Sequence, residues 1–227
     1  MPKRGIESSV TSIFEHELRR ECRLKGIDDL TLNLNSGDRR ANADSMFSAC
    51  DRFFIVEMKS RIANIGDEAR KDSVMNLCTG LITDPGIRAY HRQCHYIMWG
   101  EEVPPQNHVS TRYSIYEDSV CRSSVLPGFS SPFAPAVVAV EAGLSLAISA
   151  VAGRAGLRKP DFFYYLHWLL GDRSRTNPPF SPTRQLPITL IGNSERRELF
   201  GHVFNNYSDL DSWAEQALQN RLNNGGI

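Results

Sequence analysis

The chain has 227 residues, and its formal net charge is zero because 26 Lys and Arg residues balance 26 Asp and Glu residues. This length suffices for one large domain, or for a core with an elaboration, and for a substantial hydrophobic core. The charge balance excludes a strongly basic surface and the tight non-specific DNA affinity that phosphate neutralisation gives, but it is compatible with a local basic groove or a recruiting partner.

An amphipathic helix is predicted over Ser8–Arg23. Its apolar face consists of Val10, Ile13, Phe14, Leu18 and Leu24. Glu17 and Glu21 fall within this face, whereas Glu15 lies beyond its margin. A carboxylate on a core-facing stripe is costly unless it binds a metal or forms an ion pair. Helical phase therefore favours Glu17 as a functional carboxylate, with pairing to a nearby arginine as the structural alternative.

A first strand is predicted at Leu30–Asn35, followed by a hairpin whose strands are Ala43–Cys50 and the run beginning at Phe53. The second hairpin strand, Phe53-Phe54-Ile55-Val56, is apolar on both faces, which is typical of a central strand covered on both sides. A turn at Cys50-Asp51 sets Asp44 directly across from Glu57, with Cβ atoms about 4.5–5.5 Å apart.

Glu57-Met58-Lys59 ends this apolar run, and strand alternation places Glu57 and Lys59 on one face. Two carboxylates as close as Asp44 and Glu57 repel unless a cation lies between them, and Mg²⁺ prefers oxygen ligands of this kind. A lysine two positions on can reach an attacking water or a phosphate. Only five of the 26 basic residues are lysines, which distinguishes Lys59 from the usual surface cation of this chain. The structural alternative is an ordinary exposed strand end.

The next predicted elements are a helix at Asp67–Leu81 and a strand at Cys94–Trp99. Arg70 and Lys71 lie near the start of that helix. We expect them to contact flanking phosphates of a nucleic acid, or else to lie on a solvated helix face.

Asp44 followed by Glu57-x-Lys59, behind an N-terminal helix, resembles the PD-(D/E)xK nuclease superfamily, whose restriction-endonuclease-like fold runs helix, three antiparallel strands, helix, strand. The resemblance covers about the first hundred residues, and Ala43 stands where the family motif has proline. It implies an α/β (α+β) fold with an αβββαβ mixed-sheet core in the N-terminal half. The Glu-x-Glu-Leu string also resembles the helix of archaeal junction resolvases, in which Glu15 would match the metal-binding carboxylate; our expectation is Glu17.

The resemblance implies a nuclease dependent on Mg²⁺ or Mn²⁺ that hydrolyses phosphodiester bonds of nucleic acid, with DNA favoured over RNA. Asp44, Glu57 and Glu17 are the expected metal ligands, and Lys59 positions or activates water. One alternative is a catalytically inactive, nuclease-like binding or structural subunit of a nucleic-acid-processing or defence complex. Another is an unrelated α/β protein, for which the zero net charge leaves room.

Beyond the predicted core, residues 1–122, we expect a mainly helical extension over 123–227, packed on the core or continuous with it. Its predicted elements follow a strand at Val109–Tyr116: a loop at Ser123–Pro135, helices at Ala136–Ala152 and Phe162–Leu170, a connector at Arg173–Pro187, and helices at Ser194–Phe204 and Ser208–Leu222. The segment Phe162–Leu170 is apolar all round, so we expect it in the core or against a partner, with a homodimer as one possibility.

The five cysteines, at positions 22, 50, 78, 94 and 121, form no short pairing motif. An odd number of scattered cysteines and the absence of a signal peptide indicate a reducing, cytoplasmic environment with no membrane partner. The spacing of His91, Cys94, His95 and Cys121 matches no regular zinc module, and strand alternation would place Cys94 and His95 on opposite faces.

Overall fold

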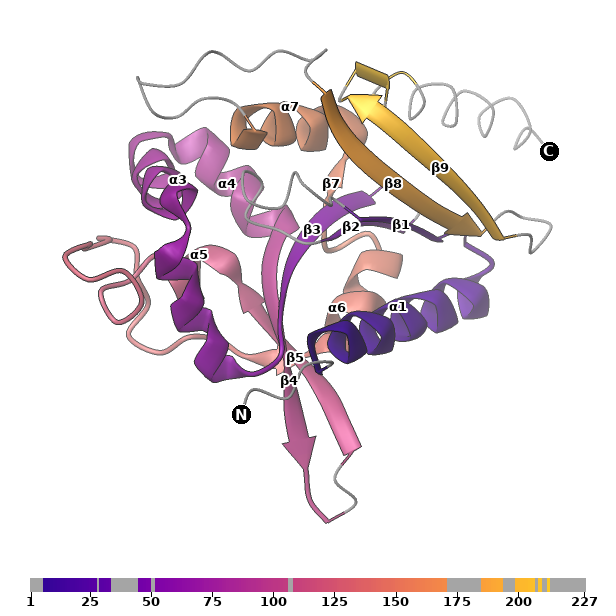
Figure 1. The fold of residues 1–227 in the computed structure, drawn as a ribbon, viewed down its shortest axis with the longest axis horizontal. Coiled ribbons are helices and arrows are strands. Elements are labelled where there is room, and N and C mark those ends of the chain that lie inside the picture. Colours follow the sequence, from indigo (N-terminus) through magenta and orange to yellow (C-terminus); the bar gives the residue numbers. More distant parts are fainter. Residues whose placement is uncertain are drawn as a thin grey trace.

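The computed structural model describes residues 6–27, 29–33, 45–49, 52–105, 108–170, 185–193, 199–206, 208–209 and 212. These residues form a mixed α/β structure in which one sheet lies between two layers of helices (Figure 1). The expected α+β class is therefore confirmed.

The sheet has nine strands in the described part of the chain. They are β1 (Asp29–Asn33), β2 (Ser45–Ala49), β3 (Arg52–Lys59), β4 (His95–Val103), β5 (His108–Ile115), β6 (Glu141–Ala142), β7 (Leu157–Arg158), β8 (Gln185–Asn193) and β9 (Leu199–Asn206). Their order is β6-β5-β4-β3-β2-β1-β8-β9, and β7 pairs with the start of β3. Strands β3 and β4 run parallel, and the other described pairs are antiparallel.

Two groups of helices cover the sheet. They are α1 (Ile6–Lys25), the 3₁₀ helix η2 (Ile62–Arg70), α3 (Asp72–Thr83), α4 (Pro85–Cys94), α5 (Tyr116–Val120), α6 (Gly143–Val151) and α7 (Lys159–Leu170). In Figure 1, α1 and α6 lie together at the lower right, while α3, α4 and α5 lie on the left. The side chains of β3 show which layer covers which face: Phe54 contacts Phe14 of α1, and Phe53 stacks on Phe162 of α7 at 5.6 Å between ring centroids.

The predicted N-terminal elements are confirmed in order and register. β2 pairs with β3 from Ser45 opposite Val56 to Ala49 opposite Arg52, which is the register that a two-residue turn gives. Seven of the eight residues of β3 are buried, as expected for a central strand. Asp44 and the turn at Cys50-Asp51 lie outside the described residues.

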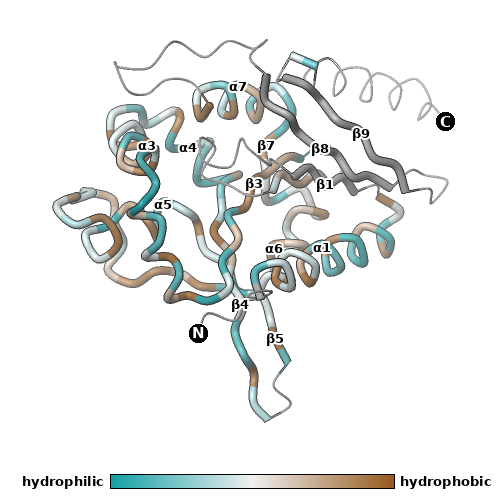
Figure 2. Tube along the Cα trace, viewed as in Figure 1, coloured by the Kyte–Doolittle hydropathy of each residue, from teal (hydrophilic) through white to brown (hydrophobic). Residues whose placement is uncertain are grey.

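Helix α1 is amphipathic as predicted, and its turns alternate between hydrophobic and hydrophilic colours in Figure 2. Its buried stripe differs from the predicted one at the C-terminal end, where Cys22 is buried and Leu24 is exposed. The expected helix at Asp67–Leu81 is also divided. The extended backbone of Lys71, with φ −90° and ψ 117°, separates the 3₁₀ helix from α3, which begins at Asp72.

The second half departs further from prediction. The expected helix at Ala136–Ala152 begins only at Gly143, because Glu141 and Ala142 pair with β5 as strand β6. The helix expected at Ser194–Phe204 is wrong from Leu199 on, since Leu199–Asn206 forms strand β9, and residues 194–198 lie outside the described part of the chain. Of the helix expected at Ser208–Leu222, only residues 208, 209 and 212 are described.

The extension expected to be mainly helical instead contributes strands β6 to β9 to the same sheet as the N-terminal strands. β8 pairs directly with β1, so the sheet crosses the boundary expected after residue 122. Helix α7 confirms the segment predicted at Phe162–Leu170, and it buries most of its apolar side chains in the core of this chain. That packing accounts for the segment without a partner, and the homodimer stays an untested prediction.

The cysteines favoured a reducing environment over a disulfide scaffold, and this prediction did not anticipate the one cysteine pair that the structure forms. Cys78 of α3 and Cys121, just after α5, form a disulfide with Cα atoms 5.4 Å apart, although they are 43 positions apart in sequence. Cys22 and Cys94 are buried free thiols. Within the described part of the chain, no helix has both the length and the apolar character needed to cross a bilayer.

Candidate active site

Glu57 and Lys59 lie at the carboxyl end of β3 and project to the same face. Both are buried, with relative exposures of 1% and 8%. Lys59 Nζ donates to Glu57 Oε1 at 2.5 Å. The pairing follows from strand geometry, since residues two apart share a face. The predicted proximity of these two side chains is therefore confirmed.

Glu68 and Lys71 complete what we call the ionic cluster: Glu57, Lys59, Glu68 and Lys71. Glu68 Oε1 lies 2.7 Å from Lys59 Nζ and 3.0 Å from Lys71 Nζ. Lys71 Nζ also donates to Glu57 Oε1 at 2.6 Å. Each ammonium therefore bridges the two carboxylates, and the four charges sum to zero.

Tyr116, the first residue of α5, holds the Glu68 carboxylate in place through a hydrogen bond. Its hydroxyl donates to Glu68 Oε2 at 2.5 Å, and its side chain is fully buried. The Tyr116 ring contacts the His95 ring at 4.5 Å between centroids. His91 and His95 each place Nδ1 2.7 Å from the hydroxyl of Tyr165. A chain of buried polar contacts thus joins the ionic cluster to the centre of the α4 and α7 layer.

Each charged group of the ionic cluster is kept ionised by the opposite charges beside it. Burial acts to lower the pKa of Lys59 and of Lys71, but the adjacent Glu57 and Glu68 carboxylates outweigh it and raise both pKa values. Burial acts to raise the pKa of Glu68, but Lys59 and Lys71 outweigh it and lower that pKa. Burial, together with the Glu68 charge, raises the pKa of Tyr116 well above its ordinary value. At neutral pH both lysines are ammonium ions and Tyr116 keeps its proton.

The structure does not bring Glu17 to this cluster. Glu17 Oε2 accepts from Thr111 Oγ1 of β5 at 3.0 Å. The strand registers place Thr111 on the face of β3 to which Met58 projects, under α1, whereas Glu57 and Lys59 project to the other face. Burial raises the pKa of Glu17, although the Thr111 hydrogen bond opposes this. The predicted carboxylate on α1 is therefore half-buried, and the sheet separates it from the predicted site.

The two residues expected to contact nucleic acid differ in placement. Arg70 has a side chain that is 83% exposed and pairs with Asp67 at 3.2 Å. Lys71 instead points inward to Glu57 and Glu68. A phosphate contact by Arg70 stays a prediction. Lys71 is a member of the ionic cluster, and its predicted phosphate contact is also untested.

Sequence reasoning missed Glu68 and Tyr116. Glu68 lies in a 3₁₀ helix, in which residues three apart share a face, and Ile65 and Glu68 are its two buried residues. That spacing was a usable signal, but the segment was assigned to an α-helix beginning at Asp67. Tyr116 follows a strand and carried no local signal.

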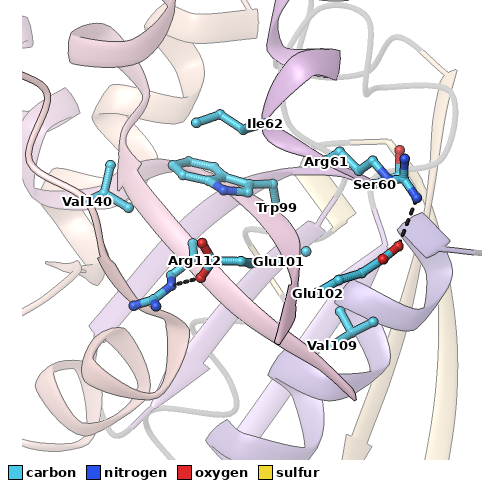
Figure 3. Close-up of a pocket in the computed structure, with 10 residues that line it drawn as sticks. Ser60, Arg61, Ile62, Trp99, Glu101, Glu102, Val109, Arg112 and Val140 are labelled. Atoms are coloured by element: carbon cyan, nitrogen blue, oxygen red, sulfur yellow. Dashed lines mark hydrogen bonds and ion pairs between the residues drawn. The ribbon is translucent and has the colours of Figure 1, made fainter. Parts of the chain in front are cut away.

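A pocket of about 320 Å³ lies beyond the end of β3, and none of the four residues of the ionic cluster lines it. Ser60 and Arg61, which directly follow Lys59, form part of its wall, and Trp99 of β4 lies at the centre of the lining in Figure 3. The described residues contain no group of three or more His, Cys, Asp or Glu side chains with the geometry of a metal site.

In comparisons with known proteins, no protein-family model, curated protein or solved structure matches the chain.

Proposed function

We propose that the chain is a metal-dependent nuclease with a restriction-endonuclease-like core and an active site at the carboxyl end of β3. Several features support this. The chain runs from α1 through the antiparallel strands β1, β2 and β3 and then, after helices, to β4, which is the expected element order. The parallel pairing of β3 with β4 gives the mixed sheet that this core requires.

The observation that carries the proposal is the buried contact between Glu57 and Lys59 at the end of β3, where the chain continues into the wall of a pocket. Buried ionised groups are costly and occur mainly where they are paired or functional. An acid and a lysine held together at a strand end, next to a cavity, are suited to phosphodiester hydrolysis.

The carboxylates also suit a hard divalent cation by their chemistry. Glu57 and Glu68 already share two cationic partners, so one positive charge can contact both. Asp44 is the further expected ligand, in the register that the β2–β3 pairing supports, and Glu68 replaces Glu17 in this proposal. Bound Mg²⁺ or Mn²⁺ would supply a water of lowered pKa and neutralise charge on the phosphate.

The role of Lys59 follows from its charge. Because its pKa is raised, Lys59 is protonated at neutral pH and cannot serve as the base that removes a proton from water. Its ammonium would instead orient the attacking water or stabilise charge developing on the phosphate.

The direct test is cleavage of labelled linear duplex, supercoiled duplex, single-stranded DNA, branched DNA and RNA, with Mg²⁺, with Mn²⁺ and with EDTA. Wild type is compared with Lys59→Ala, Glu57→Gln and Asp44→Asn. We expect metal-dependent cutting that each substitution reduces by at least about a hundredfold. Asp67→Asn is the matched control, because Asp67 is adjacent to Glu68 but contacts Asn64 and Arg70 instead of the lysines of the cluster.

Folding of each variant is checked by circular dichroism and urea unfolding, so that loss of structure is separated from loss of chemistry. Cutting that survives both Lys59→Ala and Asp44→Asn would exclude this site. Absence of cutting by folded wild type on every substrate, together with no heat of Mg²⁺ or Mn²⁺ binding in calorimetry, would exclude the function.

A second function is favoured by one observation. Both carboxylates of the cluster are already neutralised by two lysines, as in a self-contained structural element. A nuclease-like binding or structural subunit would have this property. It predicts that the same substitutions lower stability and leave nucleic-acid binding intact, with no metal-dependent cutting.

A further inference from the structure

The disulfide between Cys78 and Cys121 joins two helices that border the ionic cluster. Cys78 lies on the buried side of α3, and Cys121 directly follows the last residue of α5. Both cysteines are buried. Their Cα atoms lie 5.4 Å apart, and the bond closes a loop of chain that contains α4, β4 and β5. The disulfide therefore fixes the end of α5 against α3.

Helix α5 depends on such a link because it is very short. It has five residues, Tyr116–Val120, and all of them are buried. A helix of little more than one turn has no stability of its own in water, so its position depends on contacts with the rest of the chain. At its first residue, the Tyr116 hydroxyl donates to Glu68 Oε2 at 2.5 Å. Just beyond its last residue, Cys121 is bonded to α3.

Two arginines of α4 also contact α5. Arg88 Nε donates to Glu117 Oε1 at 2.6 Å, and an Arg92 guanidinium nitrogen donates to Asp118 Oδ1 at 2.6 Å. The arginine side chains are 21% and 33% exposed, so water screens these ion pairs, and their long side chains can follow a small shift of the helix. A covalent bond does not allow such a shift. Among these links, the disulfide therefore constrains α5 most strictly.

The disulfide also completes a ring of contacts around the cluster. Lys71 immediately precedes α3, which carries Cys78, and Tyr116 opens α5, which ends next to Cys121. Lys71 Nζ lies 3.0 Å from Glu68 Oε1, and Tyr116 donates to the other oxygen of the same carboxylate. The path from Lys71 through α3, the disulfide and α5 thus returns to Glu68. Breaking the disulfide opens this ring.

We infer that the Cys78–Cys121 disulfide is a redox-dependent lock on the ionic cluster. In the oxidised protein it holds α5 in the position from which Tyr116 supports Glu68. In the dithiol form α5 is released at its C-terminal end, and Glu68 loses part of that support. The inference rests on the proposed function in one respect, since it makes metal-dependent cleavage faster in the oxidised form than in the dithiol form.

Setting the lock is a two-electron oxidation. The Cys78 and Cys121 thiols lose two protons and two electrons as the S–S bond forms, and a low-molecular-weight disulfide accepts them and becomes two thiols. A dithiol reductant reverses the step and is itself oxidised to a cyclic disulfide. Because both sulfurs are buried, either reagent reaches them only while the chain folds or when α5 opens locally. The lock is therefore set at folding and persists in the native protein.

The first test compares wild type refolded from urea with glutathione disulfide and with dithiothreitol. Hydrogen–deuterium exchange is measured by mass spectrometry on peptides that cover α5 and, for reference, α6. We expect the α5 amides to exchange at least about tenfold faster in the dithiol form, and the α6 amides to exchange equally in both forms. Cys78→Ala, refolded in the same two ways, is the matched control, and its two preparations should not differ. Equal exchange of α5 in the two forms of wild type would overturn the inference.

A thermodynamic cycle separates a lock on the cluster from general stabilisation of the fold. Urea unfolding of wild type and Tyr116→Phe is compared in both redox forms. The loss of free energy of unfolding that Tyr116→Phe causes in the dithiol form should be at most about half of its loss in the oxidised form. Phe14→Leu, on the α1 face of the sheet, is the control, and its loss should be the same in both forms. Equal losses for Tyr116→Phe would mean that the disulfide does not act on the cluster.

Reduction of the folded, oxidised protein gives a measurement that does not require the dithiol form to fold. Coupling between two sites is reciprocal, so Tyr116→Phe should let dithiothreitol reduce the disulfide at least about fivefold faster than in wild type. Phe14→Leu should leave the rate nearly unchanged. The rate is measured by alkylating the released thiols and quantifying the Cys78 peptide by mass spectrometry. No acceleration by Tyr116→Phe, or equal acceleration by both substitutions, would overturn the inference.

The cleavage assay, run on both redox forms, separates this inference from the proposed function. Metal-dependent cutting that is equally fast in the two forms retains the nuclease and rejects the lock. Coupling between Tyr116 and the disulfide, without cutting of any substrate in either form, retains the lock and rejects the nuclease.

Discussion

Strand β3 is buried on both faces, but the two faces are stabilised differently. Towards α1, Phe54 packs with Phe14 and Phe47 through aromatic contacts, with ring centroids 5.0 Å apart for the closest pair, Phe14 and Phe47. Towards η2 and α5, the same strand ends in the ionic cluster of Glu57, Lys59, Glu68 and Lys71. Apolar packing is insensitive to pH and tolerant of small rearrangements. Buried ion pairs depend on every member, because one missing partner leaves an uncompensated charge.

The largest expected effect comes from removing one charge of the cluster. Glu68→Ala leaves the buried Lys59 and the half-buried Lys71 with one carboxylate and frees the Tyr116 hydroxyl. We expect the free energy of unfolding to fall by about 3–5 kcal/mol at neutral pH. Urea unfolding followed by circular dichroism measures it. The control Asp67→Ala, at the adjacent half-exposed position, should cost below about 1 kcal/mol. Similar losses in both variants would refute the structural importance of the cluster.

On the apolar face, Phe54→Ala should lower the free energy of unfolding by about 3–5 kcal/mol as well, because a fully buried ring is replaced by a cavity. The two substitutions are then distinguished by how their cost in free energy of unfolding depends on pH. The cost of Phe54→Ala should be the same at every pH at which wild type is folded.

The cost of Glu68→Ala should depend on pH in a defined direction. Because the folded pKa of Glu68 is lowered, its contribution is fully present above the unfolded pKa of about 4.3 and is lost as pH falls through the folded pKa. Because the folded pKa values of Lys59 and Lys71 are raised, their contribution is fully present below about 10.4 and is lost as pH rises through those values. Urea midpoints across this range, for both variants and wild type, test the contrast. A pH-independent cost for Glu68→Ala would contradict it.

Tyr116→Phe should have an intermediate effect. It removes one hydrogen bond to an ionised carboxylate, worth about 1.5–3 kcal/mol, while the ring contact with His95 remains. The control is Tyr90→Phe, which removes a longer, 3.4 Å contact to Asp161, and should cost below about 0.5 kcal/mol. Thermal and urea unfolding of both variants distinguish the two sites, and equal costs would mean that Tyr116 does not support Glu68.

The smallest effect is expected at the surface. The Arg61–Glu102 pair, at 2.8 Å, has side chains that are about half exposed. Removing it with Arg61→Ala should change stability by less than about 1 kcal/mol, and the change should shrink further in high salt. A larger loss of stability that persists in high salt would show that exposure to solvent does not make this ion pair weaker than those of the ionic cluster.

Much of the local structure followed from sequence alone. Alternation placed Glu57 and Lys59 on one face, and the length of the turn fixed the β2–β3 register. Both are consequences of short-range geometry, in which a strand has a period of two and a turn of given length allows one pairing. The same reasoning placed the half-buried carboxylate of Glu17 on the inner margin of α1 but could not say on which side of the sheet it would lie.

Long-range pairing explains the failures. Ser194–Phe204 is rich in charged residues that favour helix, but pairing with β8 makes Leu199–Asn206 a strand, and β8 in turn pairs with β1 from the other end of the chain. Tertiary contacts commonly override local propensity in this way.

Local sequence patterns were sufficient to predict an N-terminal helix, a central buried strand and an acid and a lysine side by side at its end. The groups that contact this pair depend on how distant elements pack together. Glu68 and Tyr116 reach it from elements 11 and 59 positions beyond Glu57, Cys78 meets Cys121 across 43 positions, and Glu17 is held on the opposite face. The physical reason is that local periodicity sets the direction of a side chain relative to its own element, whereas its partners depend on which elements pack together.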